Sequence, residues 1–336
     1  MTRFLAKRGI LIGVMLLGLL TLTFFISHVA PGDPAHLRAG PDATPEMVEV
    51  IRVKYGLDKP LMTQFYVYLK GMLVGDWGES IHSSRKVWDE LVIYFPNTAE
   101  LVIFSILIAI VLGVPIGVLA AVNQNTAIDH FLRVLSISGV ALPMFWLGLM
   151  LQLFFALKHP LFPLNGQLHV LLDPPDPITH LILVDSLLRG QWSLFINAAQ
   201  HMVLPALTLS VPGMASIIRV NRAEMLETLN KDYIVNARAQ GLSAFRIIGM
   251  YALRNAMLAT MAMIGLRFGW MLGGTVMVET VFDWPGVGLY AVNGAINNDF
   301  APIIGSTIVL GFFFMLTNLV IDIIYGVLDP RVRTQI

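Results

Sequence analysis

The sequence predicts an all-α polytopic membrane protein with six transmembrane helices. Hydrophobic residues make up 56% of the 336 residues and charged residues only 13%. This composition is typical of a chain that is largely dissolved in lipid. A helix needs about 20 mostly apolar residues to cross about 30 Å of hydrocarbon. Six segments meet this requirement, namely residues 10–29, 99–122, 134–157, 201–220, 256–278 and 302–324.

The first apolar segment is predicted to be retained as a helix, not cleaved as a signal peptide. It is about twice as long as the apolar part of a typical signal peptide, and it ends in His28-Val29-Ala30-Pro31 without a small residue three positions before a cut. The following Pro31-Gly32-Asp33-Pro34 is expected to stop the helix, because proline removes a backbone donor and disfavours helix at the residue before it.

Lysine and arginine predict the orientation of the spans. The two termini and the second and fourth loops carry twelve basic and five acidic residues, whereas residues 31–96 carry seven basic and nine acidic ones. Basic loops stay in the cytoplasm, and six spans then place both termini there. The net charge of zero argues against a nucleic-acid partner. Cysteine is absent, which excludes disulfides and thiolate metal sites.

A polar segment separates the fourth and fifth spans. Residues 219–254 hold six basic and three acidic residues and nothing apolar enough to cross a membrane. We expect a first helix over residues 222–239, a break at Gly241, and a second helix that Ser243 caps and that runs to about Leu253. The alternative is an amphipathic helix on the anionic inner leaflet.

Two loops on the outer side of the membrane are predicted to form structure of their own. Residues 55–60, 64–69 and 75–78 indicate a small cap region of helices and turns. Residues 158–200 form a loop too long for a simple turn between packed helices. Within it, residues 173–177 are proline-rich and expected to be extended, and residues 179–188 are apolar enough for a half-buried helix.

The fifth span carries an arginine near the middle of the bilayer. Gly265, Gly269 and Gly273 recur every four residues, and small residues at this spacing allow another helix to approach closely. Arg267 lies on the opposite face, which we expect to border a cavity or a partner subunit. The same face carries Thr260, Met263, Trp270, Met271 and Gly274. The alternative is a structural ion pair of Arg267 with Asp322 or with a carboxylate of a partner.

Catalytic motifs are missing from the sequence. It has no Gly-x-x-x-x-Gly-Lys-Ser/Thr phosphate loop, no Gly-x-Ser-x-Gly elbow and no His-Glu-x-x-His pair. The histidines lack metal-ligand spacing. We therefore predict no catalytic, cofactor-binding or metal-ligating residue and no enzyme activity. An ion-coupled secondary transporter remains an alternative, although its expected internal repeats and midplane carboxylates are not evident.

Several motifs, in order, resemble the dipeptide, oligopeptide and nickel family of ABC-importer permeases. They are Pro-Gly-Asp-Pro at 31–34, Gly-Leu-Asp-Lys-Pro at 56–60, Gly-Asp-Trp-Gly at 75–78, Thr-His-Leu-Ile-Leu-Val-Asp-Ser at 179–186, Ala-Arg-Ala-Gln-Gly-Leu at 237–242, Leu-Arg-Asn-Ala at 253–256 and Glu-Thr-Val-Phe-Asp-Trp-Pro-Gly-Val-Gly at 279–288. One departure is Ala259, where the family usually has proline, so the fifth span is expected to begin without a kink.

The resemblance implies a type I ABC importer permease fold with a periplasmic cap region. It divides the chain into residues 1–97, a permease core of residues 98–326 with a coupling loop at 221–255, and a tail of residues 327–336. The implied ATPase-coupling residues are Ala237, Arg238, Ala239, Gly241, Leu242, Ser243, Ala244, Arg246 and Arg254. The expected translocation path comprises Thr260, Met263, Arg267, Trp270 and Met271. The expected periplasmic motif comprises Glu279, Trp284, Pro285 and Gly286, and its aromatic residue has an interfacial anchor on a tight turn as its alternative role.

The implied function is the import of dipeptides or short oligopeptides across the bacterial inner membrane. The long loop at 158–200 favours this substrate class over nickel chelates, glutathione, haem or opines, which remain alternatives. The implied partners are a second homologous permease subunit, two nucleotide-binding ATPase subunits, a periplasmic solute-binding protein and membrane lipid. ATP and magnesium are expected on the ATPase subunits, and no cofactor on this chain.

Overall fold

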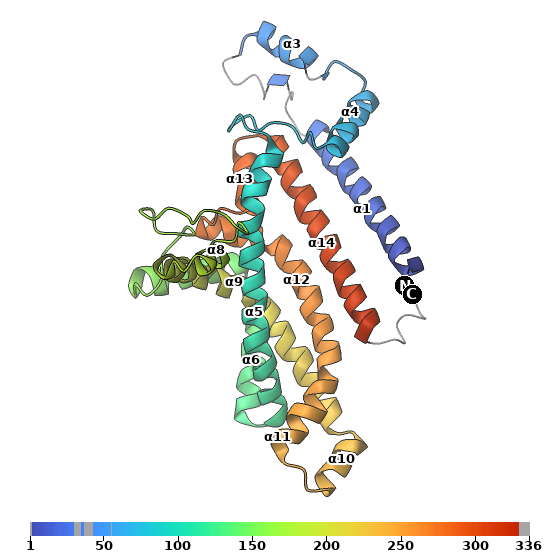
Figure 1. Cartoon of the computed structure of the whole chain (residues 1–336), viewed down its shortest axis with the longest axis vertical. Coiled ribbons are helices and arrows are strands. Elements are labelled where there is room, and N and C mark those ends of the chain that lie inside the picture. Colours follow the sequence, from blue (N-terminus) through green and yellow to red (C-terminus); the bar gives the residue numbers. More distant parts are fainter. Residues whose placement is uncertain (1, 30–34, 37–42, 55, 329–336) are drawn as a thin grey trace. The chain divides into compact units, whose positions relative to one another are not determined.

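The computed structural model describes residues 2–29, 35–36, 43–54 and 56–328. The predicted Pro31-Gly-Asp-Pro34 stop, Tyr55 and the basic tail after Leu328 lie outside these residues. Helices dominate, and the described residues form no strand beyond an isolated bridge between Glu79 and Lys86 (Figure 1). The helices are α1 (Thr2–Val29), α3 (Pro45–Lys54), α4 (Leu61–Val74), α5 (Val87–Val122), α6 (Ala127–Ala141), α7 (Met144–Gln152), α8 (Ile182–Leu188), α9 (Trp192–Leu229), α10 (Asp232–Ala239), α11 (Ala244–Arg246), α12 (Arg254–Phe282), α13 (Val287–Ile296) and α14 (Phe300–Leu328), with π-helical turns η1 (Leu153–Lys158) and η2 (Ile247–Leu253).

Five of the six predicted spans coincide with single long apolar helices. In the described residues these spans are Arg8–Ile26, Val87–Val122, Trp192–Leu229, Ala244–Phe282 and Phe300–Ile321. Several helices are longer than predicted, since α5 begins twelve residues before residue 99 and α9 extends nine residues on each side of residues 201–220. The hydropathy pattern therefore located the apolar core of each helix and underestimated its ends.

The predicted third span is wrong as a single straight helix. Helices α6 and α7 with η1 meet at an angle of 106°. The bend falls at Leu142 and Pro143, where Leu142 adopts an extended conformation with ψ of 130°. Proline disfavours helical backbone at the residue before it and lacks an N–H group, which explains the break. The segment is a broken span or a re-entrant loop.

The chain forms two compact units. The first contains residues 1–96 and 285–315, and the second contains residues 97–284 and 316–336. Helices α5 and α14 each begin in the first unit and continue in the second. The predicted domain boundary after residue 97 stays a prediction, while residues 285–315 group with the N-terminal part of the chain.

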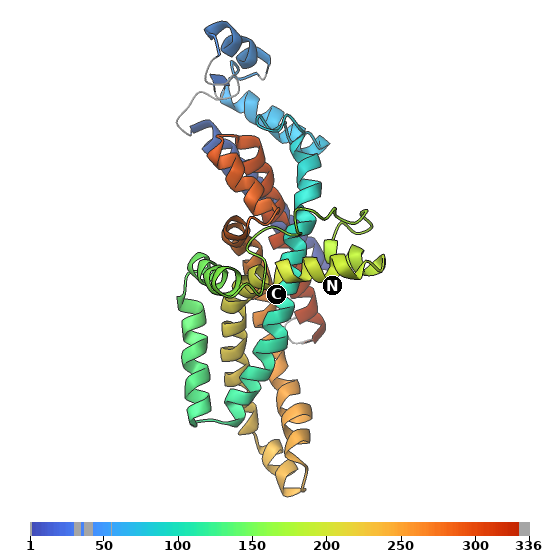
Figure 2. The same cartoon turned by 90° about the vertical axis from the view of Figure 1, so that its left-hand side faces the viewer.

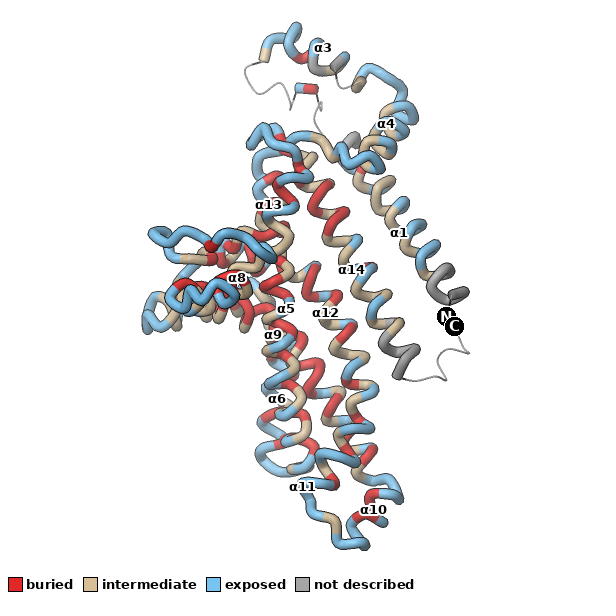
Figure 3. The backbone as a smooth tube through the Cα atoms, in the orientation of Figure 1, coloured by how far each residue is buried: buried red, intermediate tan, exposed pale blue. Residues whose placement is uncertain are grey.

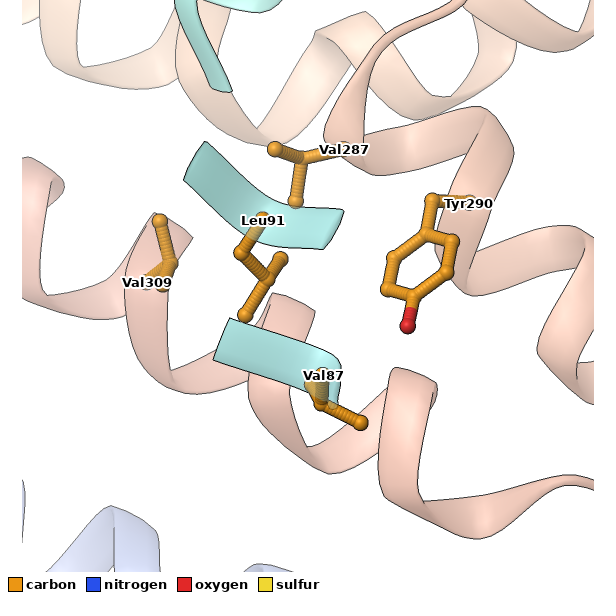
Figure 4. Packing of buried hydrophobic residues seen from close by; sticks show 5 residues of the cluster. All are labelled: Val87, Leu91, Val287, Tyr290 and Val309. Carbon is orange, nitrogen blue, oxygen red and sulfur yellow. The ribbon is translucent and has the colours of Figure 1, made fainter. Parts of the chain in front are cut away.

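The first unit has a small apolar core. Val87, Leu91, Val287, Tyr290 and Val309 are buried together, so that α5, α13 and α14 meet there (Figure 4). The Tyr290 hydroxyl donates a hydrogen bond of 2.6 Å to a Glu90 carboxylate oxygen. Phe24 of α1 packs against Phe65 and Tyr68 of α4. The helix predicted around residues 64–69 is thus present as α4, and residues 56–59 form a turn, while α3 lies before the residues that the sequence singled out.

A carboxylate fastens the segment before α5 to the start of α14. Asp299 is buried, and its Oδ2 accepts hydrogen bonds of 2.7 Å from the Ser80 hydroxyl and 2.7 Å from the Ile81 N–H. The His82 N–H donates to the same oxygen at 3.2 Å. This single oxygen therefore holds three groups of the 79–86 turn.

The second unit is organised around α9. Helices α6, α7, α8 and α12 all contact it, and α12 runs along its side (Figures 1 and 2). Buried residues recur along both α9 and α12 (Figure 3). Close approach depends on glycine, since a methyl group at Gly117 of α5 would lie 2.8 Å from the Asn221 side-chain oxygen of α9. Gly113 lies one turn away against Ile217. Both glycines mark a tight contact between α5 and α9.

Candidate functional site

The polar segment between α9 and α12 folds into a short helical hairpin, residues 230–253. It contains α10, a turn at residues 240–243, α11 and η2. The predicted first helix over residues 222–239 is wrong, because α9 ends at Leu229 and a break at Asn230 and Lys231 precedes α10. The predicted break at Gly241 is confirmed.

Gly241 closes the hairpin turn. Its φ of +77° lies in the left-handed region, which favours glycine. The Gly241 N–H donates to the Arg238 carbonyl at 3.0 Å, and the Leu242 N–H donates to the Ala237 carbonyl at 3.2 Å. This pair of bonds is the Schellman pattern that ends many helices. Leu242 then packs onto Ile234, Ala237 and Ile247, which are the buried core of the hairpin.

The second arm of the hairpin is continuous with the fifth span. A helix extends from Ala244 to Phe282 without a break, which confirms the prediction that residue 259 does not kink it. Ser243 occupies the N-cap position, but its side chain forms no capping hydrogen bond, so the predicted serine cap is wrong. Because the helix is continuous, a displacement of residues 244–253 is transmitted directly to α12.

The outer surface of the hairpin is both apolar and cationic. The side chain of Phe245 is 88% exposed and that of Met250 67%. Arg238, Arg246 and Arg254 are exposed as well. Of the other predicted coupling residues, Ala237 is buried, Leu242 is partly buried, and Ala239, Gly241, Ser243 and Ala244 are exposed. Large exposed apolar side chains interspersed with arginine are typical of a protein interface.

A cavity of about 610 Å³ lies between the hairpin and the adjoining ends of α5 and α9. Its lining combines apolar side chains with a few polar ones, namely Ala121, Val122, Gln124, Leu226, Leu229, Asn230, Arg238, Leu242, Ala244, Ile247 and Ile248. The hairpin is therefore attached to the spans along η2 and not packed against them over its whole length.

The predicted translocation residues are divided between two environments. Thr260 is buried and its hydroxyl accepts a hydrogen bond of 3.1 Å from the Asn221 amide of α9. Met271 is buried against α9. Its methyl carbon lies 2.6 Å from the position that a β-carbon would occupy at Gly213. Arg267 and Met263 are partly exposed, whereas Trp270 is 71% exposed.

The expected division of α12 into a packed glycine face and an open opposite face is wrong. Gly265 does pack against Ile321 of α14, but a methyl group at Gly273 would contact nothing within 4 Å. The opposite face carries Thr260 and Met271, and both contact α9. The helix is therefore packed on two sides, and the assignment of a path to this face stays a prediction.

The predicted outer motif is buried in the protein. Glu279 accepts a hydrogen bond of 2.7 Å from the Thr98 hydroxyl, and the Trp284 indole donates one of 3.1 Å to the Asn97 carbonyl. Both Glu279 and Trp284 are fully buried. The alternative role of Trp284 as an interfacial lipid anchor is therefore wrong. Pro285 and Gly286 follow it and lead into α13.

The 158–200 loop is fixed to the spans by buried polar side chains. Glu100 of α5 accepts a hydrogen bond of 2.8 Å from the Leu183 N–H, at the start of α8. Gln152 donates to the carbonyls of Leu164 and Val281 at 2.9 and 3.0 Å. The helix predicted for residues 179–188 is present but begins at Ile182.

Asp185 forms a second anchor inside this loop. Its carboxylate accepts hydrogen bonds from the N–H groups of Ile178, Thr179 and His180 and from the Thr179 hydroxyl. Burial raises the pKa of Asp185, but these four bonds outweigh it and hold the pKa below the ordinary value of 3.8.

We expect the loop to loosen in acid through Asp185. Because its folded-state pKa is depressed, the stabilisation is present above the ordinary pKa and is lost as the pH falls below about 4. Hydrogen exchange of the N–H groups of residues 178–180 measures it, with faster exchange expected at pH 3 than at pH 6 after correction for intrinsic rates. Asp185→Asn is the control, since it should exchange fast at both values. Equal protection of the unsubstituted chain at the two values would contradict this expectation.

An ion pair that the sequence did not reveal lies at the end of the fourth span. Asp129 of α6 is fully buried, and Arg222 of α9 donates to its two oxygens at 2.7 and 2.8 Å. The Asn125 N–H also donates to Asp129. Thr126, three residues earlier, caps α6, and this spacing was the available signal for a helix start. Nothing in the sequence indicated the partner on α9, which lies 93 residues away.

Comparison with known proteins identifies the family. Residues 113–334 match the family described as the binding-protein-dependent transport system inner membrane component, and residues 1–102 match its N-terminal region. The chain belongs to this family. The predicted resemblance to ABC-importer permeases is confirmed, and the chain is a multi-pass inner-membrane component of a transport system.

Relatives of this permease match it over nearly their whole length. The probable D,D-dipeptide transport system permease protein of Escherichia coli K12 is 44% identical over 315 residues, which cover 94% of this chain and 93% of that protein. The dipeptide transport system permease protein of the same strain is 38% identical over 336 residues, or 99% of each chain. The glutathione transport system permease protein of that strain is 34% identical over 325 residues, covering 95% and 97%.

Proposed function

We propose that this permease is one of two membrane subunits of an ATP-driven importer of dipeptides or short oligopeptides. A periplasmic solute-binding protein delivers the solute, and two ATPase subunits hydrolyse ATP with magnesium. This chain binds neither ATP nor a metal. Both of its termini are cytoplasmic, as the distribution of basic residues indicates. The second permease subunit is homologous to this one.

The continuous helix from the hairpin into α12 is the observation that carries the coupling part of this proposal. The hairpin presents Phe245 and Met250 outward beside three exposed arginines, and no other part of the described chain covers them. An ATPase subunit that binds this surface moves α12 as a rigid body when it changes conformation. Such a movement switches the access of a central path from one side of the membrane to the other.

Relatives supply the argument for the substrate class. The most similar relatives named above are a D,D-dipeptide and a dipeptide permease, at 44% and 38% identity, and the glutathione permease is at 34%. We propose dipeptides first because identity to those permeases is higher and their match is as complete. Glutathione is itself a peptide and is the second candidate.

Reconstitution tests the proposed function. The permease is co-purified with its partner permease and ATPases, incorporated into liposomes, and supplied with binding protein and radiolabelled dialanine. We expect uptake that requires both ATP and binding protein. Uptake by this chain alone, driven by a proton or sodium gradient, would instead establish the ion-coupled transporter.

Cross-linking tests the position of the ATPase. The chain has no native cysteine, so Ala244→Cys or Arg246→Cys provides a single thiol on the exposed side of α11. We expect a disulfide with a cysteine introduced on the membrane-facing surface of the ATPase, detected as a shifted band on non-reducing gels. Ala127→Cys, exposed at the start of α6 outside the hairpin, is the matched control. Equal cross-linking from both positions would contradict docking at the hairpin.

A further inference from the structure

Two arginines lie close together on neighbouring helices of the second unit. Arg267 belongs to α12 and Arg219 to α9, and the two helices pack side by side (Figure 2). The Asn221–Thr260 hydrogen bond and the contact of Gly213 with Met271 show that the helices are antiparallel. This register places Arg219 level with about residue 262 of α12. At 1.5 Å per residue, Arg267 is about 7 Å further along the axis.

The two arginines act on each other as like charges. The register brings Arg219 and Arg267 near each other, and two guanidinium groups of like charge repel. Within the described side chains, neither arginine has an ion pair or a hydrogen bond. The side chain of Asp322, the predicted alternative partner, lies outside the described residues. Arg219 is exposed and Arg267 partly exposed, so both guanidinium groups are open to a neighbour from outside this chain.

Arg267 lies inside the fifth span, and Arg219 lies at the cytoplasmic end of the fourth span, where the polar segment begins. The charge of Arg267 in particular needs water or an anion. Charged side chains within spans rarely face lipid and usually line pathways of ions or substrates. The nearest carboxylate beyond Arg267 on α12 is Glu279, twelve residues or about 18 Å away, and it is bound to Thr98. Lipid contact would leave the charge of Arg267 unsolvated, about 7 Å along the helix axes from the like charge of Arg219. An aqueous path through which an anion passes would solvate both guanidinium groups and give them a partner of opposite charge.

We propose that Arg219 and Arg267 together form an anion-binding step on the translocation path that receives the carboxylate group of the solute. This inference rests on the proposed function. It adds Arg219 to the translocation path and names the carboxylate as the group of the solute that is bound there. A carboxylate pairs strongly with guanidinium groups through charge-assisted hydrogen bonds. The two sites, about 7 Å apart along the helices, allow it to move from one to the other. Solutes without a carboxylate gain nothing from this step, and cations are repelled.

Thiol chemistry at Met263 tests the site independently of transport. Met263 is one turn before Arg267 and level with Arg219, and Met263→Cys gives the chain its single cysteine. In the complete transporter in lipid nanodiscs, rates of modification are measured with an anionic sulfonatoethyl and a cationic trimethylammonioethyl methanethiosulfonate. We expect the anionic reagent to react faster. Adding Arg219→Gln or Arg267→Gln should lower the anionic-to-cationic rate ratio about fivefold, because one charge about 7 Å away acts oppositely on the two reagents.

Leu258→Cys is the matched control. It lies nine residues from Arg267, hence on the opposite side of α12, and its rate ratio should change less than twofold. A Met263→Cys thiol that neither reagent modifies would overturn the inference, because the arginines would not border water. An unchanged ratio after Arg219→Gln would also overturn it, since an acidic residue of a partner subunit would then already neutralise the site.

Transport separates this inference from the proposed function. With saturating dialanine-loaded binding protein, the Arg219→Gln/Arg267→Gln variant should transport at least fivefold less dialanine per ATP hydrolysed than the unsubstituted complex. Equal transport per ATP would overturn the role in translocation. Failure of the proposed function has a different signature, because the unsubstituted complex itself would then not import dialanine while the rate ratio at Met263→Cys still depends on the arginines.

Discussion

Replacing Gly241 with valine is expected to abolish the stimulation of ATPase activity by loaded binding protein. Gly241 has a φ of +77°, which a β-branched residue adopts only with strain. A side chain there would contact nothing within 4 Å, so the effect comes from the backbone and not from a clash. Valine would open the turn at residues 240–243, which connects α10 to α11, and would thereby displace the surface around Phe245.

The spans should be untouched by this substitution. Gly241 lies outside every apolar helix of the described chain, so membrane insertion and assembly with the second permease should match those of the unsubstituted protein. The measurement is ATP hydrolysis by the reconstituted complex with and without loaded binding protein. Stimulation is expected to fall more than tenfold, while basal hydrolysis persists.

Gly241→Asn is the matched control. Asparagine tolerates left-handed backbone far better than valine and is expected to keep most of the stimulation. If valine preserved full stimulation, or if asparagine abolished it equally, the turn geometry would not be what the ATPase requires.

Removing the carboxylate of Asp129 is expected to cause the largest loss of stability. Asp129 is fully buried and Arg222 binds both of its oxygens. Asp129→Ala leaves the Arg222 guanidinium without its partner in a largely buried position. Breaking a buried ion pair from one side costs about 3–5 kcal/mol. Arg133 lies 3.7 Å from the same carboxylate and loses its interaction too.

A double-mutant cycle isolates the pair. Asp129→Ala, Arg222→Ala and the double variant are compared by thermal unfolding of the complex in detergent. We expect the double variant to be much less destabilised than the sum of the single ones, because the second substitution removes the charge that the first left unpaired. Additive losses would show that each side chain acts through other contacts. The exposed pair Glu227 and Lys231, also 2.7 Å apart, is the control and should contribute little to stability, because solvent screens its charges.

Local pattern predicted much of the polar hairpin. Gly241 was identified as a break because glycine ends helices, and the structure assigns it a positive φ. The continuous start of the fifth span followed from Ala259. The hairpin's first helix was predicted too long, since residues 222–239 contain no glycine or proline to mark the break at Asn230 and Lys231. Ile234 and Ala237 pack onto Ile247, and this contact supports the break. A local sequence pattern cannot predict the contact, because the residues are brought together only by the turn between them.

The sequence by itself determined the class of the protein, the apolar core of each span and the family. These follow from hydropathy and from motifs a few residues long, because lipid forces backbone groups to hydrogen-bond within a helix. Only the tertiary structure decided which side chains meet. It paired Asp129 with Arg222, buried Trp284 against Asn97, bent the third span at Pro143 and packed the helix of Arg219 against that of Arg267. These contacts join residues far apart in the chain, and the side-chain geometry that selects them exists only after the helices have packed.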